Sequence, residues 1–147
     1  MQVDVVTGIV IERPRAEVAA FARDPDNVPR WYKNIKSVEW KTPRPLARGS
    51  RIGFVADFMG RQLVYTYEVV EFQEDDRFVM RTADGPFPME TTYAWESLGP
   101  DLTRMSLRNR GEPTGFSGLM APLMATMMRQ ANRKDLALLK RLLETSR

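Results

Sequence analysis

The C-terminal third of this chain predicts one long amphipathic helix, and the residues before it predict a sheet. From Gly115 to Arg147, only Pro122 and two early glycines interrupt helix-compatible sequence. Apolar residues recur there at the spacing of one helical face, and the first of them are methionines. This stripe comprises Met120, Met124, Met127 and Met128, followed by Ala131, Leu138 and Leu142. A single helix of this length has to be held by the sheet, so its buried face shapes the interior.

Pro122 leaves two forms of this helix open. Either the helix begins at about Ala121 with the proline in its first turn, or it begins near Phe116 and bends at the proline. We favour the bent or two-segment form, in which the methionine segment leans toward the sheet.

Seven segments before the helix predict strands, because apolar and polar residues alternate along them and turn residues separate them. The first runs from Val3 to Ile11, with its odd positions on the buried face. The others are 35–40, 51–59, 62–72, 78–82, 89–97 and 103–110. Two short helices are expected after the first strand, since Pro14 suits a first turn and Asp24 with Pro25 suits a second helix start. Consecutive hairpins predict an antiparallel sheet with one covered and one solvated face.

The charged residues of these strands alternate to the face opposite the apolar ones. Opposite charges on neighbouring strands explain them as cross-strand pairs on a solvated face. The set comprises Asp57, Glu68, Arg81, Glu90, Arg104 and Arg108.

The chain of 147 residues contains no histidine and no cysteine. Ser-His-Asp and Cys-His catalysis, disulfides and the usual zinc sites are therefore excluded within it. The net charge of +3 is spread along the chain without a run of like charges, so we expect no nucleic-acid partner. No apolar stretch is long enough to cross a bilayer, and the N-terminus has no basic segment of a secretion signal. We expect no stable membrane insertion, a cytoplasmic location and a single domain over residues 1–147.

Three stretches carry a resemblance to a known family. They are AEVAAFARDPDNVPRWYKNI after the first strand, the RIGF strand with its hairpin after a proline-rich loop, and the ending NRKDLALLKRLLE. In this order the chain resembles the START/Bet v 1-like (SRPBCC, helix-grip) superfamily, and within it the bacterial polyketide cyclase/dehydrase-like branch. The resemblance covers essentially the whole chain. It implies an α+β fold with a seven-stranded antiparallel sheet wrapped around the long helix, two short helices between strands 1 and 2, and a cavity under the helix.

The inward positions of the strands and helices predict the wall of that cavity. Methionine is flexible and polarizable, so a wall of Met and aromatic residues adapts to varied apolar ligands. The alternative is that these side chains simply fill a core. The candidate ligand-binding residues are Trp31, Phe54, Phe58, Tyr65, Tyr67, Met80, Met89, Tyr93, Trp95, Met105, Met120, Met124, Met127 and Met128.

A few polar residues share the inward face. Tyr65, Tyr67 and Tyr93 offer hydroxyl groups, and Thr91 and Asn109 have the same parity. Asp135 lies on the helix stripe, where a buried carboxylate without a partner is costly.

For Asp135 we expect a solvated or paired carboxylate, the alternative being a polar anchor or general base at one end of the cavity. No pair of inward carboxylates is found, so we name no catalytic residue, and we expect no metal and no cofactor.

We expect a protein that binds or carries a hydrophobic small molecule such as a lipid, an isoprenoid or a polyketide, as a monomer or homodimer. A polyketide cyclase or dehydratase in which tyrosines and bound water act is the alternative, and a protein-interaction role is a further one. The loop from Gly111 to Gly118, with Pro113 and two glycines, is expected to gate access to the cavity.

Overall fold

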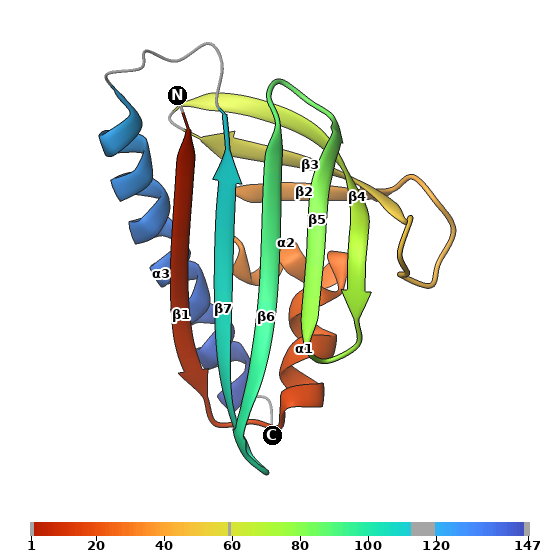
Figure 1. The fold of residues 1–147 in the computed structure, drawn as a ribbon, viewed down its shortest axis with the longest axis vertical. Helices are drawn as coiled ribbons and strands as arrows, with labels where there is room; N and C mark the ends of the chain where they lie inside the picture. Colours follow the sequence, from red (N-terminus) through yellow and green to blue (C-terminus); the bar gives the residue numbers. More distant parts are fainter. Residues whose placement is uncertain (1, 59, 113–119, 146–147) are drawn as a thin grey trace.

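A computed structural model describes residues 2–58, 60–112 and 120–145. Its seven strands form one antiparallel sheet in the order β1-β7-β6-β5-β4-β3-β2 (Figure 1). With the long helix that the sheet holds, this confirms the predicted α+β helix-grip fold. The strands are β1 (Val3–Ile11), β2 (Ile35–Trp40), β3 (Arg51–Phe58), β4 (Arg61–Gln73), β5 (Arg77–Asp84), β6 (Met89–Gly99) and β7 (Leu102–Gly111).

The alternation along the strands places their side chains as predicted. In β1 the odd positions Val3, Val5 and Ile11 are buried, whereas Val6 and Val10 are exposed. Strands β4 to β7 run one or two residues beyond the predicted ends. Pairing of the backbone continues there into the turns, beyond the residues where apolar and polar side chains alternate.

The two short helical segments close one end of the curved sheet (Figure 1). They are α1 (Arg15–Arg23) and the pair η1 (Pro25–Asn27) and α2 (Val28–Trp31). The Asp24 carboxylate accepts a hydrogen bond from the Asp26 backbone N–H at 3.0 Å, which caps this second segment. The Trp31 ring lies 5.7 Å from the ring of Tyr93, so α2 packs directly on β6.

The long helix α3 (Ala121–Glu144) places Pro122 in its first turn. A proline is tolerated there because the first backbone N–H groups of a helix have no partner within it. The described helix thus begins as in the first of the two forms, whereas the bent or two-segment form that we favoured depends on a segment near Phe116 that lies outside the described residues. Residues 113–119, which include Phe116 and most of the expected gating loop, lie outside the described residues.

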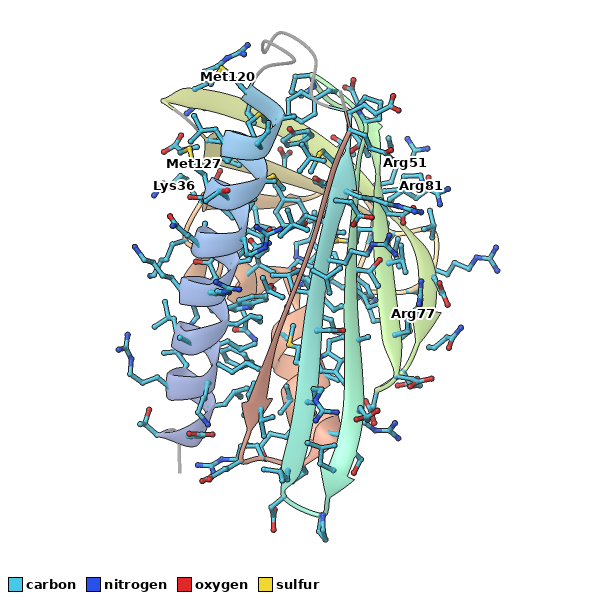
Figure 2. The ribbon with its side chains drawn as sticks, turned by 60° about the vertical axis from the view of Figure 1, so that its left-hand side comes forward. Lys36, Arg51, Arg77, Arg81, Met120 and Met127 are labelled. Atoms are coloured by element: carbon cyan, nitrogen blue, oxygen red, sulfur yellow. The ribbon has the colours of Figure 1, made fainter. Side chains whose placement is uncertain are left out.

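The two halves of α3 belong to different apolar clusters. The C-terminal half places Leu136, Leu139 and Leu143 in the main core of the molecule. The N-terminal half contributes Met124 to a small separate cluster with Val3 and Val5 of β1. Figure 2 shows side chains filling the space between α3 and the sheet along most of its length. The helix is thus anchored firmly at one end and held by fewer apolar side chains at the other.

The C-terminal end of α3 is also joined to the turn that follows β1. The Glu144 carboxylate accepts a hydrogen bond from the Glu12 backbone N–H at 2.7 Å. Arg13 donates to the Glu144 carbonyl oxygen at 2.6 Å, and Lys140 donates to the Val10 carbonyl oxygen at 3.0 Å. The first strand and the last helix therefore meet at this end of the molecule.

The outer face of the sheet carries cross-strand ion pairs, as the alternation predicts. Arg51, Arg77 and Arg81 extend away from α3 in Figure 2. None of the described helices combines the length and the apolar character that a membrane span requires. The cross-strand pairs on this face are Arg51–Glu68, Arg81–Glu90, Arg110–Glu90, Arg104–Glu96 and Arg108–Asp4.

Candidate functional site

A cavity of about 110 Å³ lies between the sheet and the N-terminal half of α3. Strands β3 to β7 supply most of its wall, α2 with the segment that follows it closes one side, and α3 contributes three side chains. The cavity therefore lies where the small cluster around Met124 and the main core meet. Most of its lining is aromatic or aliphatic, and four methionines take part: Met80, Met89, Met124 and Met128.

Nine of the fourteen candidate residues line this cavity. They come from the inward face of four strands and from one side of α3, so the structure brings together residues that are far apart in the sequence. These nine are Phe54, Phe58, Tyr65, Tyr67, Met80, Met89, Tyr93, Met124 and Met128.

The other five candidates lie elsewhere. Trp31, Trp95 and Met105 are fully buried in packed core, because residue parity identifies the face of a strand but not the depth at which a void lies. Met120 and Met127 sit at the N-terminal half of α3 (Figure 2), and neither lines the cavity. Met127 is 36% exposed.

The residues of α3 that are buried against the sheet form a row next to the apolar stripe that the sequence predicted. The fully buried positions are Met124, Asn132, Asp135, Leu136, Leu139 and Leu143, whereas Leu138 and Leu142 are half-buried. The predicted stripe combined residues from two adjacent rows of the helix surface. Both rows contain apolar residues, so the sequence alone does not show which row the sheet covers.

Several lining residues lie outside the candidate set. Ala56 and Leu63 share the inward parity of their strands, and Asn132 continues the four-residue spacing of Met124 and Met128, so the sequence contained a signal for these three. Four others come from short helical or turn segments without periodicity, and no pattern marks them: Val28, Tyr32, Asn34 and Phe87. Ile35 is the first residue of β2, at the edge of the alternating pattern. Asp57 also borders the cavity but is exposed.

A set of hydrogen-bonded polar side chains lies on the cavity wall. Asn109 donates from Nδ2 to the Tyr32 hydroxyl at 2.9 Å and accepts at Oδ1 from the Thr91 hydroxyl at 2.9 Å. Burial raises the pKa of Tyr67 to about 12, although hydrogen bonds with Thr91 and Thr82 lower it in part. The expected polar patch of Thr91 and Asn109 is thus found on the cavity wall, with its hydrogen bonds satisfied internally.

Two further tyrosines on the wall are strongly desolvated. Burial raises the pKa of the Tyr93 hydroxyl well above its ordinary value, and the nearby Tyr32, Tyr67 and Asp135 raise it further. Burial, with a smaller contribution from Tyr67, also raises the pKa of Tyr65. Both hydroxyls are therefore neutral at physiological pH and act as hydrogen-bond donors or acceptors, not as bases.

Asp135 is buried at 4% exposure, so the expectation of a solvated or ion-paired carboxylate is wrong. Its Oδ1 accepts a hydrogen bond from the Lys33 backbone N–H at 3.3 Å, and its Oδ2 has no partner among the described residues. Burial raises the pKa of Asp135 to about 6, against the opposing effect of the Lys33 backbone N–H and charge. The sheet and α2 cover the helix further toward its C-terminus than the sequence indicated.

The arrangement can enclose an apolar molecule and offer it hydroxyl and amide groups. Asp135 is the one described buried carboxylate, and it lies outside the cavity lining. Among the described residues, no cluster of His, Cys, Asp and Glu side chains could hold a metal ion.

Comparison with solved structures shows the same fold in other bacterial proteins. The chain is 25% identical to the protein TTHA0849 from Thermus thermophilus, with a TM-score of 0.83, over 98% of this chain and 99% of that one. It is 19% identical to a START superfamily protein from Mycobacterium smegmatis, with a TM-score of 0.79 and coverages of 95% and 98%. It is 12% identical to the ZhuI aromatase/cyclase from Streptomyces sp. R1128, with a TM-score of 0.79 and coverages of 98% and 94%.

A comparison with curated protein sequences gives no match. A family model described as polyketide cyclase/dehydrase and lipid transport matches residues 2–144. The described fold, with its sheet curved around a C-terminal helix, is the START/polyketide cyclase-like fold. The chain therefore belongs to the polyketide cyclase/dehydrase and lipid transport family.

Proposed function

We propose that this protein binds and carries a hydrophobic small molecule in the cavity between the sheet and α3. The observation that supports this function is the composition of the wall, where four methionines and several aromatic rings surround a void. A core selected for stability alone is packed without voids of this size. An apolar lining with a few polar groups is the usual character of a ligand site.

The size of the cavity limits what it holds without rearrangement. Pockets for small molecules measure about 300–1,000 Å³, and an engineered apolar cavity of about 150 Å³ admits benzene. At about 110 Å³, this cavity takes a ligand of roughly one ring unless it expands. The methionine side chains, each with three rotatable bonds, provide the means of expansion, since they line both the sheet and the helix side.

Native mass spectrometry of protein purified from its own host tests this proposal directly. We expect a co-purifying apolar mass that organic solvent removes. If protein from the host carries no such mass and binds no apolar probe when titrated, the carrier function is contradicted.

Replacing one alanine on β3 and one on β6 by leucine shows whether that mass occupies the cavity. Ala56 lines the cavity, so Ala56→Leu fills much of it, and we expect the bound mass to be lost. Ala94 lies on the outer face of the same sheet and outside the cavity lining, so Ala94→Leu should retain the mass. Circular dichroism verifies that both variants are folded. Retention by Ala56→Leu would place the bound molecule elsewhere.

A cyclase or dehydratase activity is the second candidate, and the polar residues of the wall favour it. Tyr65, Tyr67 and Tyr93 line the same cavity, and their hydroxyl groups could orient a polyketone and polarise a carbonyl toward ring closure. A triple variant with Phe at these three positions should still bind a candidate substrate but no longer convert it. Equal turnover by the variant would exclude the tyrosines from such chemistry.

A further inference from the structure

The cavity is lined by two buried asparagines that differ in their hydrogen bonding. Asn109 is satisfied on both sides of its amide by Tyr32 and Thr91. Asn132 of α3 is 3% exposed, and its Nδ2 has no hydrogen-bond partner among the described residues. Both residues carry an amide group and line the same cavity. They differ in that the Asn132 amide can still donate a hydrogen bond to another molecule.

Asn132 is unusual among the buried polar groups of the described chain. Five side chains there have a buried nitrogen or oxygen atom without a partner, and Asn132 alone of them lines the cavity. Buried amides are nearly always hydrogen-bonded, and an exception calls for an explanation. The five are Arg13, Trp31, Trp95, Asn132 and Asp135.

The position of Asn132 on the helix would suit an apolar residue better. Its neighbours on the covered side of α3 are Met128, Leu136 and Leu139, and a leucine at 132 would pack without an unpaired amide. A residue that packs less well than an apolar one, and that gains no hydrogen bond within the protein in return, is expected at a functional site. The amide turns readily about its last side-chain bond, so it can present an N–H group to a molecule in the cavity.

Tyr93 supplies a second donor on the same wall. Tyr93 lines the cavity, and its hydroxyl stays protonated because burial raises its pKa. Asn132 and Tyr93, two residues whose side chains can donate a hydrogen bond, therefore line the same cavity.

The charges around the cavity determine what kind of acceptor fits. No lysine or arginine belongs to the described lining, and the one charged lining residue is the exposed Asp57. Asp135 is buried within one helical turn of Asn132. An anionic ligand would lose its hydration there without meeting a cation and would lie near carboxylates, which is strongly unfavourable.

We propose that Asn132, with Tyr93, determines ligand specificity by donating hydrogen bonds to an uncharged oxygen, such as a ketone carbonyl, on an otherwise apolar molecule. This inference rests on the proposed function and narrows its ligand class to neutral oxygen-bearing compounds. Carboxylates such as fatty acids are excluded from the class.

Three probes of nearly identical shape separate these possibilities. Acetophenone carries a carbonyl, α-methylstyrene replaces that oxygen with a methylene group, and benzoate carries a carboxylate. Each is titrated into ¹⁵N-labelled protein, and the dissociation constant and the shift of the Asn132 side-chain amide are measured by NMR. We expect acetophenone to bind about tenfold more tightly than α-methylstyrene, the ratio that one well-formed hydrogen bond gives, with benzoate weakest.

Asn132→Leu is the test variant and Asn109→Leu is its matched control. In Asn132→Leu we expect the preference for acetophenone to disappear while α-methylstyrene still binds. Its melting temperature should rise by about 2–4 °C, because an unpaired buried amide is replaced by an apolar side chain. Asn109→Leu should lower the melting temperature, since it leaves Tyr32 and Thr91 without their partner.

The outcomes separate this inference from the proposed function. If acetophenone and α-methylstyrene bind equally, or benzoate binds best, the role of Asn132 is overturned while binding of apolar molecules stands. A lower melting temperature for Asn132→Leu would overturn it also, since the amide would then be structural. If none of the three probes binds, the inference is overturned, and native mass spectrometry of the protein from its host then decides whether the proposed function stands.

Discussion

At the scale of single residues, the buried carboxylate of Asp135 is expected to make the stability of the protein depend on pH. Its pKa of about 6 in the folded protein lies above the value of 3.8 for an unperturbed aspartate. The unfolded chain therefore loses this proton at lower pH than the folded protein does. Between pH 4 and 6 the folded state binds more protons, so the free energy of unfolding falls as the pH rises through this window.

Asp135→Asn should remove this dependence. The amide oxygen can still accept the hydrogen bond of the Lys33 backbone N–H, but the group no longer ionises. Urea unfolding at a series of pH values should show similar stability for variant and wild type near pH 4. Above pH 6 the variant should be more stable by up to about 3 kcal/mol, the free energy that corresponds to the shift in pKa. Parallel curves across the whole range would contradict the assignment.

At the scale of elements, the helix α3 is held unequally along its length. Leu139 is fully buried in the main core, whereas Leu123 is 51% exposed at the opposite end. Leu139→Ala should therefore lower the free energy of unfolding by about 2–5 kcal/mol, as other buried leucines do. Leu123→Ala should change it by less than about 0.5 kcal/mol, because an exposed side chain loses little contact.

The same two substitutions test whether Leu139 and Leu123 contribute unequally to holding α3 on the sheet. Chemical denaturation of the two variants measures the difference directly. Equal effects would mean that Leu123 contributes as much to the packing of α3 as Leu139 does, against the difference in their burial.

At the scale of the whole molecule, the ion pairs on the outer face of the sheet contribute unequally to stability. Glu96 and Arg104 form an exposed ion pair, and Glu96→Gln should shift the melting temperature by less than about 2 °C. The side chain of Glu90 is only 15% exposed and pairs with both Arg81 and Arg110. Burial alone would raise the pKa of Glu90, yet these arginines outweigh it and keep the pKa below its ordinary value. Glu90→Gln should thus lower the melting temperature more than Glu96→Gln, and scanning calorimetry measures both.

The sequence predicted the architecture well, because strand parity and turn residues are local signals. It identified Phe54, Tyr67 and Tyr93 on the inward face without knowing how far apart the strands lie. It could not separate Tyr93, which borders the cavity, from Trp95, which is packed in the core, since both have the same parity. Depth depends on how the sheet curves, and this is a property of the assembled strands.

The burial of Asp135 and the cavity position of Phe87 were missed for a related reason. Phe87 lies in the turn before β6, where no periodicity indicates which side chain faces inward. Whether Asp135 is covered depends on where α2 and the segment after it meet α3, about one hundred residues away in the chain. Contacts of this kind are set by tertiary packing and not by local pattern.

The pairing of β1 with β7 determines when the sheet of this protein can be completed during synthesis. During synthesis, β1 emerges first, but the strand on which it pairs is the last of the seven, and α3 follows even that strand. Until then β1 has no partner and the apolar face of the sheet lacks its helix. Hairpins β3 to β6 can form on the ribosome, whereas the cavity cannot, because its helix wall is made last. The cavity can therefore form only after α3 has been synthesised.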